Sequence, residues 1–223
     1  MNAEEHILRT WQQNAGPWVR SIAEGAIESR RLVTDHAIVN AITLLHPTRV
    51  WDIGCGEGWL CRELQHRGIE TIGTDAIPAL VDAARQQGKG RYEVLAYDQI
   101  TSDVARQWSA DCYVFNFSLF GHEGVGSLLQ QLHATLPTSG NLVIQTLHPF
   151  TALGAGPYQS GWRQGSWDGF SADFVDPAPW YYRTLSHWID LLQGTGYILR
   201  SLQEPIHPHT GLPASLILIA GHR

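Results

Sequence analysis

From residue 47 onward, short apolar runs alternate along the chain with stretches of helical periodicity. The runs that we expect to form strands are 49–53, 70–74, 92–95, 111–117, 141–147, 197–202 and 215–221. The helices expected between the first five runs lie near 57–67, 77–87, 101–108 and 124–136. Strands that alternate with helices of about 10–15 residues are typical of βαβ units. The pattern therefore predicts an α/β fold in which helices cover both faces of a parallel sheet.

Two segments do not follow this alternation. Residues 1–46 have apolar positions at three- and four-residue spacing, which predicts an N-terminal helical cap. We expect Pro17 to begin a helix and Pro47 to end the segment. Residues 148–183 are rich in Gly, Pro, Ser and aromatic side chains and have no clear period. Because disordered segments are typically poor in aromatic residues, we expect a folded flap here, within a main domain of residues 47–223.

The composition argues against several classes of protein. The chain has 21 acidic and 15 basic residues, a net charge of −6 and no basic run, which argues against a general nucleic-acid binder. The longest apolar stretch near an end, 212–220, is too short for a membrane-spanning helix. Residues 1–20 do not resemble a secretory signal, and the three cysteines include no CxxC pair. We therefore expect a cytoplasmic protein without a disulfide framework or a structural zinc site.

A glycine-rich turn, Asp-Ile-Gly-Cys-Gly-Glu-Gly at 52–58, follows the first expected strand and precedes a helix. Glycines at such a turn let the backbone approach a ligand closely, and the helix N-terminus offers free N–H donors. A dinucleotide fingerprint requires a small residue where this chain has Trp59, which disfavours an NAD- or FAD-dependent oxidoreductase. A phosphate-binding P-loop is excluded, because no Gly-Lys-Ser/Thr follows.

The turn resembles motif I of the class I S-adenosylmethionine-dependent methyltransferases, which the sequence VWDIGCGEG matches at every defining position. The resemblance implies that Asp75, 21 residues after Gly54, accepts hydrogen bonds from the ribose of the cofactor. It also implies a polar contact to the adenine after the third strand, and a backbone that passes the cofactor after the fourth. The residues expected to bind S-adenosylmethionine are Asp52, Gly54, Cys55, Gly56, Asp75, Ala76, Tyr97, Asp98, Asn116 and Phe117. The alternative is that the glycines only make a tight turn and Asp75 caps a helix.

The resemblance covers residues 49–221 and carries expectations about the fold. It implies a Rossmann-like sheet of seven strands in the order 3-2-1-4-5-7-6, with strand 7 antiparallel. The chain is similar to the small-molecule, ubiquinone-biosynthesis-like branch of these methyltransferases, in which N-terminal helices form part of a lid over the cofactor. Arg30 and Arg31 either bind the carboxylate of the cofactor or lie at a solvated helix end.

Histidines after the fourth and fifth expected strands are the candidate catalytic residues. Methyl transfer is an in-line displacement at a sulfonium methyl group, so a base is needed only where the acceptor must lose a proton. Ligands of open α/β sheets lie beyond the carboxyl ends of the strands, where we expect His122 and His148. We prefer His148 as base or substrate anchor, because the flap begins there. The alternative for both is a hydrogen-bonded structural histidine.

The flap supplies the candidate substrate residues. Its aromatic side chains are expected to wall a pocket for a flat or apolar acceptor. Arginines in the flap favour an acidic substrate, whereas Asp168 and Asp173 favour an amine, and the sequence does not choose between them. The expected substrate residues are Trp162, Trp167, Tyr181, Tyr182 and Arg183. Alternatively, these aromatic residues only hold the flap onto the sheet.

These features predict transfer of a methyl group from S-adenosylmethionine to a small molecule by a monomer or homodimer, without a metal ion. They leave open whether an oxygen, nitrogen or carbon atom is methylated. One alternative is a cofactor-binding protein without turnover that acts as a sensor or partner subunit. Another is a methyltransferase of protein or RNA. The negative charge argues against it, as does Asn-Phe-Ser-Leu at 116–119, where an amino-methylation signature is expected.

Overall fold

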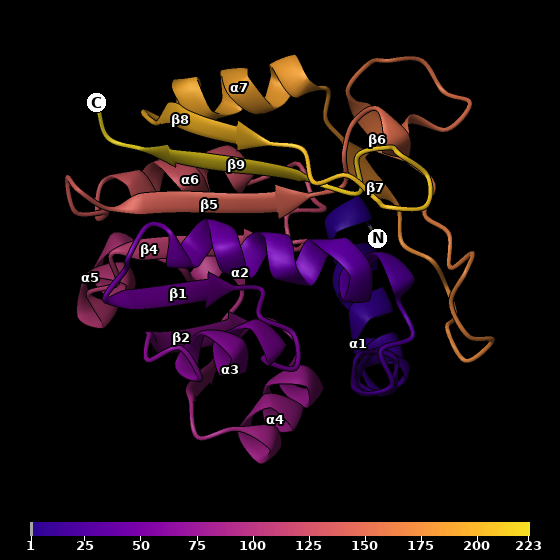
Figure 1. Ribbon diagram of the computed structural model, residues 1–223, viewed down its shortest axis with the longest axis horizontal. Coiled ribbons are helices and arrows are strands. Elements are labelled where there is room, and N and C mark those ends of the chain that lie inside the picture. The colour runs from indigo at the N-terminus through magenta and orange to yellow at the C-terminus, as the bar shows by residue number, and fades with distance from the viewer. Residues whose placement is uncertain (1) are drawn as a thin grey trace.

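The computed structural model describes residues 2–223, and its central feature is a sheet of seven strands (Figure 1). In chain order these strands are β1 (Arg49–Ile53), β2 (Glu70–Asp75), β3 (Arg91–Val94), β4 (Cys112–Asn116), β5 (Asn141–Thr146), β8 (Ile198–Gln203) and β9 (Leu216–Gly221). Their spatial order is β3-β2-β1-β4-β5-β9-β8, and β9 runs antiparallel to both of its neighbours. The predicted order with an antiparallel last strand is confirmed, because β8 and β9 are the sixth and seventh strands of this sheet.

Helices cover both faces of the sheet, as the apolar inner strands predict. The helices that follow β1, β2, β3, β4 and the flap are α3 (Trp59–Gln65), α4 (Pro78–Gln87), α5 (Ser102–Trp108), α6 (Val125–His133) and α7 (Leu185–Gly194). Successive side chains of a strand point to opposite faces. Val50 therefore packs in the core with α2 (Asp35–Thr43) and α3, whereas Trp51 packs in the core with α5, α6 and α7. Figure 1 shows α2 in front of the sheet and α6 behind it.

The N-terminal elements are α1 (Ala3–Ala23), the π-helical turn η1 (Arg30–Thr34) and α2 (Asp35–Thr43). Helix α1 begins with a capping box, in which the Asn2 side chain accepts from the N–H of Glu5 and the Glu5 carboxylate accepts from the N–H of Asn2. The prediction that Pro17 begins a helix is therefore wrong. Pro17 lies inside α1, because the capping box at Asn2 starts the helix several turns before Pro17. Met1, the first residue of the predicted cap, lies outside the described residues.

The segment 148–183, which we call the flap, lies between β5 and α7. Its ordered elements are the 3-10 turn η3 (Thr151–Leu153) and a two-stranded antiparallel ribbon of β6 (Gly161–Arg163) and β7 (Trp180–Tyr182). Helix α1, this ribbon and the loop 204–215 all lie toward the edge of the sheet where the parallel strands end (Figure 1). Among residues 2–223, no helix is both long and apolar enough to span a bilayer.

Candidate active site

The glycine turn after β1 lies at the carboxyl edge of the sheet. Gly54, Gly56 and Gly58 have φ angles of +82°, +57° and +80°, a left-handed conformation that strains any residue with a side chain. A Cβ atom at Gly54 would lie 2.9 Å from Oη of Tyr97, and one at Gly58 would lie 2.7 Å from the ring of Tyr92. Backbone geometry and close packing therefore both require glycine at Gly54 and Gly58.

Asp75 ends β2 beside this turn, and its carboxylate is held by main-chain donors. Oδ2 accepts from the N–H of Gly56 at 2.9 Å, and Oδ1 accepts from the N–H of Ile77 at 2.9 Å. Ala76 lies between these partners in the chain. Burial raises the pKa of Asp75, and the bonds from the main chain oppose that rise. The acid predicted at this position therefore has a fixed orientation toward the glycine turn.

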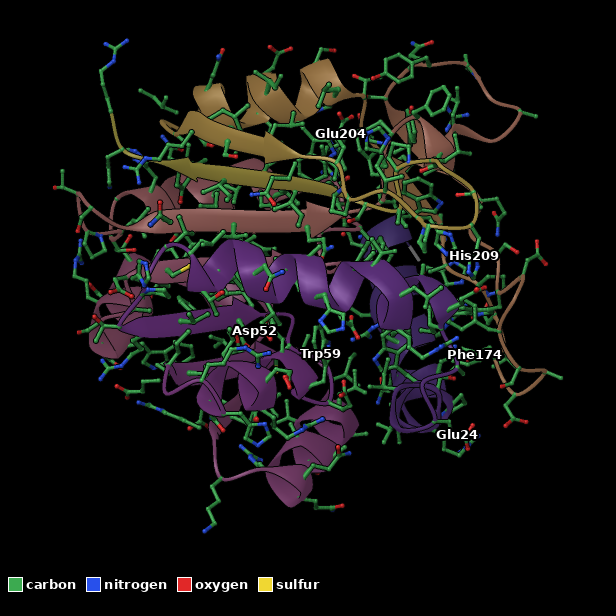
Figure 2. All side chains as sticks on the ribbon, in the orientation of Figure 1. Glu24, Asp52, Trp59, Phe174, Glu204 and His209 are labelled. Atoms are coloured by element: carbon green, nitrogen blue, oxygen red, sulfur yellow. The ribbon has the colours of Figure 1, made fainter. Side chains whose placement is uncertain are left out.

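Several buried side-chain oxygens at this edge have no hydrogen-bond partner within residues 2–223. Among them are Oδ1 of Asp52, Oε2 of Glu57 and Oδ1 of Asn116, which we call the oxygen cluster. Asp52 and Asn116 lie near the ends of the neighbouring strands β1 and β4, and Glu57 lies in the glycine turn (Asp52 is labelled in Figure 2). Burial raises the pKa of Asp52 to about 7 and also raises the pKa of Glu57. Buried acceptors without donors cost free energy, so this cluster suits a ligand that carries several N–H or O–H groups.

Arg30 places a cation near the oxygen cluster. Its guanidinium lies 4.7 Å from the ring centre of Trp59, which Figure 2 labels, and 5.7 Å from that of Trp18. Its Nε donates to Oδ1 of Asp35 at 3.0 Å, whereas its buried Nη2 has no acceptor in the described chain. The charge of Arg30 opposes the rise in pKa that burial causes at Glu57. Of the two uses expected for Arg30, the solvated helix end does not fit this partly buried side chain.

The turns after β3 and β4 close against the glycine turn. Oη of Tyr97, in the 3-10 turn η2 (Tyr97–Gln99), donates to the main-chain oxygen of Ser118 at 3.0 Å, and the Ser118 hydroxyl donates to the main-chain oxygen of Ile53 at 2.8 Å. Phe117 has a φ of +52°, a strained conformation for a residue with a side chain. The structure thus brings Tyr97 and Phe117 to the glycine turn, whereas the Asp98 side chain is exposed to solvent.

Cys55, another expected cofactor residue, has a buried side chain. It packs with Cys61 and Tyr92 on the side of the turn that faces α4, and its N–H donates to the main-chain oxygen of Thr74 at 2.9 Å. The cysteines of the chain are free thiols. Burial raises the pKa of Cys55 and Cys61 well above the ordinary value of a thiol, which disfavours the reactive thiolate.

Helix α1 covers the glycine turn from outside. Ala15 and Trp18 pack against Ile77 and Leu80, which follow β2. Nε1 of Trp18 lies 3.5 Å from where a Cβ atom on Gly56 would be. Helix α1 therefore lies against the glycine turn and the start of α4.

The flap fastens this lid helix. The side chain of Asn14, which is fully buried, donates from Nδ2 to the main-chain oxygen of Val175 at 2.8 Å and accepts from its N–H at 2.9 Å. Asp176 pairs with Arg9 at 2.8 Å and with His6 at 3.0 Å. The flap residues 173–176 therefore bind the outer face of α1.

His148 follows β5 and is buried, and both of its ring nitrogens have partners. Nε2 lies 2.7 Å from Oε1 of Glu204, which follows β8 and is labelled in Figure 2. Nδ1 accepts from the N–H of Phe150 at 3.2 Å. This pattern sets the tautomer: Nε2 carries the proton that Glu204 accepts, and Nδ1 carries the lone pair. Nδ1 is thus the basic atom, held by one long main-chain bond.

His122 lies in the loop after β4 and joins part of the flap. Its exposed ring stacks on Tyr181, with ring centres 3.9 Å apart and planes 15° apart. Arg183 is 3% exposed, donates from Nη2 to the main-chain oxygen of Gly121 at 2.6 Å, and lies 4.9 Å from the ring centre of Tyr181. Burial lowers the pKa of Arg183 to about 10. The structure therefore groups His122, Tyr181 and Arg183, apart from the contacts of His148.

The other expected substrate residues separate into three environments. Trp162 is 40% exposed and lies edge-on to Tyr181. Tyr182 is buried, and its hydroxyl donates to the main-chain oxygen of Pro149 at 2.8 Å, beside His148. Trp167 lies edge-on to Trp11 of α1, with ring centres 5.9 Å apart. Part of the predicted aromatic wall thus holds the flap to α1.

A comparison with protein families shows which family the chain belongs to. A family model described as a methyltransferase domain matches residues 27–202, well over half of the chain. The chain belongs to this methyltransferase family. No group of three or more His, Cys, Asp or Glu side chains suited to a metal ion occurs in this methyltransferase over residues 2–223.

Curated relatives match about half of this methyltransferase. The biotin biosynthesis bifunctional protein BioHC of Cellvibrio japonicus is 32% identical over 109 residues, which are 49% of this chain and 22% of that protein. The ubiquinone biosynthesis O-methyltransferase of Bradyrhizobium diazoefficiens is 29% identical over 111 residues, which are 49% of this chain and 44% of that protein. The matched segments thus span less than half the length of either relative.

A solved structure supports the fold over the whole chain. The magnesium protoporphyrin IX methyltransferase of Synechocystis PCC 6803, solved with bound S-adenosylhomocysteine, is similar with a TM-score of 0.67. The similarity covers 100% of both chains at 14% sequence identity. At that identity the likeness shows a shared fold, and the chemistry of the site must be argued from its own residues.

Several residues of the site had no recognisable signal in the sequence. Glu57 lies inside the recognised motif, so its position was known, but its burial was not. The sequence gives no signal for Asn14 and Glu204, because their hydrogen-bond partners are distant in the chain and only the fold brings them near. It gives none for Asp35, because a π-helical turn brings Asp35 to Arg30.

Proposed function

We propose that this methyltransferase binds S-adenosylmethionine at the glycine turn and transfers its methyl group to a small-molecule acceptor. The observation that carries the proposal is the oxygen cluster of Asp52, Glu57 and Asn116, with the buried guanidinium of Arg30 nearby. The amino-acid end of S-adenosylmethionine has an ammonium group, which donates up to three hydrogen bonds, and a carboxylate, which accepts them. Its donors suit the cluster, and its carboxylate suits Nη2 of Arg30.

The charges around the turn support a cationic ligand. Asp52, Glu57 and Asp75 are three acids with a pKa raised by burial. Arg62 donates to Glu57 from Nη2 at 3.1 Å, and Arg30 pairs with an acid of its own helix. A sulfonium and an ammonium group therefore meet an environment with an excess of acidic side chains, which they would stabilise in the charged form.

The adenosine half is assigned to the neighbouring turns. We expect the carboxylate of Asp75 to accept from the ribose hydroxyls, since each of its oxygens retains a second lone pair beside the bond from the main chain. Tyr97 and Asp98 are expected at the adenine. The glycines permit close approach of the backbone, and a Cβ atom would collide with Ser118 and Tyr97 at Gly54 or with Tyr92 at Gly58.

When bound, S-adenosylmethionine supplies a methyl group already activated by its sulfonium sulfur. The chain itself contributes orientation and exclusion of water, through α1 and the flap that fastens it. Where the acceptor must lose a proton, we assign the base to His148: Glu204 holds the proton on Nε2, and Nδ1 takes up the proton of the acceptor once it releases the bond from the N–H of Phe150. His122, stacked on Tyr181, is the second candidate for contact with the acceptor.

A small-molecule acceptor is supported by the flap and by charge. Aromatic residues Trp162, Tyr181 and Tyr182 and the buried Arg183 lie on or beside the ribbon, which suits a flat acceptor with an acidic group. The net charge of −6 argues against RNA. Curated relatives are named for steps in the biosynthesis of biotin and ubiquinone, both small molecules. We expect the protein to act in the cytoplasm as a monomer or homodimer.

The test is transfer of a labelled methyl group. The purified protein is incubated with methyl-labelled S-adenosylmethionine and a panel of phenols, carboxylic acids and amines, beside total RNA and protein extracts. Label in a small-molecule product that is lost in the Gly54→Ala variant supports the proposal. Label found only in RNA or protein overturns the acceptor class. Tight binding of the cofactor without label in any fraction favours a binding protein without turnover.

A further inference from the structure

The helix that carries Arg30 contains a π-helical turn, η1. The N–H of Asp35 donates to the main-chain oxygen of Arg30, five residues earlier, instead of the four of an α-helix. Residues five apart on an α-helix point about 140° away from each other, since each residue turns the chain by about 100°. The wider turn brings these two side chains together, and Nε of Arg30 donates to Oδ1 of Asp35 at 3.0 Å. Bulges of this kind are frequent at functional sites.

The contact with Asp35 limits where the guanidinium can lie. The Arg30 side chain is 12% exposed, and that of Asp35 is 32% exposed. With Nε bound and one face lying over Trp59, the guanidinium has few other orientations, because its fork is planar and rigid. Its Nη2, which has no acceptor among the described residues, is thereby held in a buried position, and the charge of Arg30 acts on Asp52 and Glu57.

The sheet also contacts the π-helical turn. Gln145, at the carboxyl end of β5, donates from Nε2 to the main-chain oxygen of Thr34 at 3.2 Å and to the hydroxyl of Ser215 at 2.9 Å. Gln145 pairs in register with Asn116, a member of the oxygen cluster. The last residue of the π-helical turn is therefore tied to the end of β5, which pairs with the end of β4 that carries Asn116.

We propose that Asp35 is a positioning residue of the cofactor site: through the π-helical turn it holds Arg30 so that Nη2 meets the carboxylate of the amino-acid end of S-adenosylmethionine. The inference rests on the proposed function and deepens it. Asp35 itself does not touch the ligand. Its effect passes through Arg30, so it vanishes when the guanidinium is removed.

A double-mutant cycle tests this inference. Dissociation constants for S-adenosylhomocysteine are measured by calorimetry for the wild-type chain, Arg30→Ala, Asp35→Ala and the double variant. We expect about a tenfold loss of affinity for each single variant and no further loss for the double variant. Asp35→Asn keeps an oxygen acceptor for Nε and should recover most of the affinity. Asp103→Ala, which breaks an exposed ion pair of 2.9 Å with Arg106, is the matched control and should bind as the wild type does.

A second ligand separates positioning from loss of structure. 5′-Methylthioadenosine lacks the amino and carboxyl groups, so its affinity should change less than twofold in every variant. Losses from Arg30→Ala and Asp35→Ala that multiply in the double variant would overturn the inference, as would equal losses for both ligands or no recovery with asparagine. A wild-type chain that fails to bind S-adenosylhomocysteine would overturn the proposed function as well.

Discussion

The main-chain N–H of Gly56 donates a hydrogen bond of 2.9 Å to Oδ2 of Asp75. This bond joins the glycine turn after β1 to the end of β2, two segments that are expected to face the same ligand. The other oxygen of Asp75 accepts from the N–H of Ile77, so the carboxylate orders the turn from both sides. Asp75 therefore has a structural role within the chain in addition to the ribose contact that we assign to it.

Replacing Asp75 should weaken cofactor binding and loosen the turn together. Asp75→Ala is expected to cost about 1–3 kcal/mol of binding free energy for S-adenosylhomocysteine, the range for hydrogen bonds to a charged acceptor. The melting temperature should also fall, because two main-chain donors lose their partner. Asp82→Ala, on the exposed side of α4, serves as the control. Unchanged affinity in Asp75→Ala would place the ribose elsewhere.

Two glycine variants separate backbone strain from crowding. Gly54 and Gly68 have φ angles of +82° and +80°, but a Cβ atom at Gly68 meets nothing within 4 Å, whereas one at Gly54 meets Ser118 and Tyr97. Gly68→Ala should lower the free energy of unfolding by about 1 kcal/mol and leave ligand affinity unchanged. Gly54→Ala should abolish binding of S-adenosylhomocysteine in calorimetry while the chain stays folded by circular dichroism. Similar affinities of the two variants for S-adenosylhomocysteine would contradict a role of the glycine turn in binding.

The burial of Asp52 predicts a dependence of stability on pH. Its pKa is about 7 in the folded chain, against about 3.9 in an unfolded one. Between these values the unfolded chain has lost the proton that the folded chain keeps, so the free energy of unfolding falls as the pH rises, and it levels off above about pH 7. The full shift corresponds to at most roughly 4 kcal/mol. Urea unfolding at several pH values should show this fall in the wild type and not in Asp52→Asn; parallel curves would contradict it.

The contact between His148 and Glu204 predicts how turnover responds to mutation. His148→Ala should slow methyl transfer at least tenfold, since general bases contribute about 10²–10⁴, while affinity for S-adenosylhomocysteine stays within about twofold. Glu204→Gln should lower the rate less, because the amide oxygen can still accept the proton of Nε2 and keep the ring in place. Equal rates in wild type and His148→Ala would show a structural histidine. His122→Ala, measured in parallel, reports on the second candidate.

The bond between Asn14 and Val175 predicts a link between the flap and ligand release. Asn14→Ala leaves the N–H and oxygen of Val175 without their side-chain partner, at a cost of about 1–3 kcal/mol in the free energy of unfolding. Because α1 covers the glycine turn, dissociation of S-adenosylhomocysteine should be faster, and limited proteolysis within 166–176 should speed up. Asn40→Ala, exposed on α2, is the control. Identical dissociation and proteolysis rates in Asn14→Ala and wild type would uncouple flap and lid.

The sheet could be predicted from sequence because its strands are buried on both faces. The run 141–147 contains the apolar stretch Leu142–Val143–Ile144, and the observed strand Asn141–Thr146 lies within this run. The glycine turn could be assigned because its chemistry is local: glycines, an acid before them and a helix after them. Asp75 followed from the same logic, one strand later.

The contacts around the turn could not be predicted, because they join distant segments. Asn14 and Val175 are 161 residues apart in the chain, and periodicity carries no information about such a pair. Trp167 was expected to wall a substrate pocket, yet its ring lies against Trp11 of α1. The π-helical turn at Arg30 also escaped notice, since a single widened turn barely changes the apolar spacing of the helix.

Calorimetric titration of the wild-type chain with S-adenosylhomocysteine, with NAD as the control ligand, tests the central claim most directly. The oxygen cluster and Arg30 predict micromolar or tighter binding of S-adenosylhomocysteine and none of NAD. Absence of heat with S-adenosylhomocysteine, or equal binding of NAD, would contradict the assignment of the glycine turn as a site for the methyl-donor cofactor.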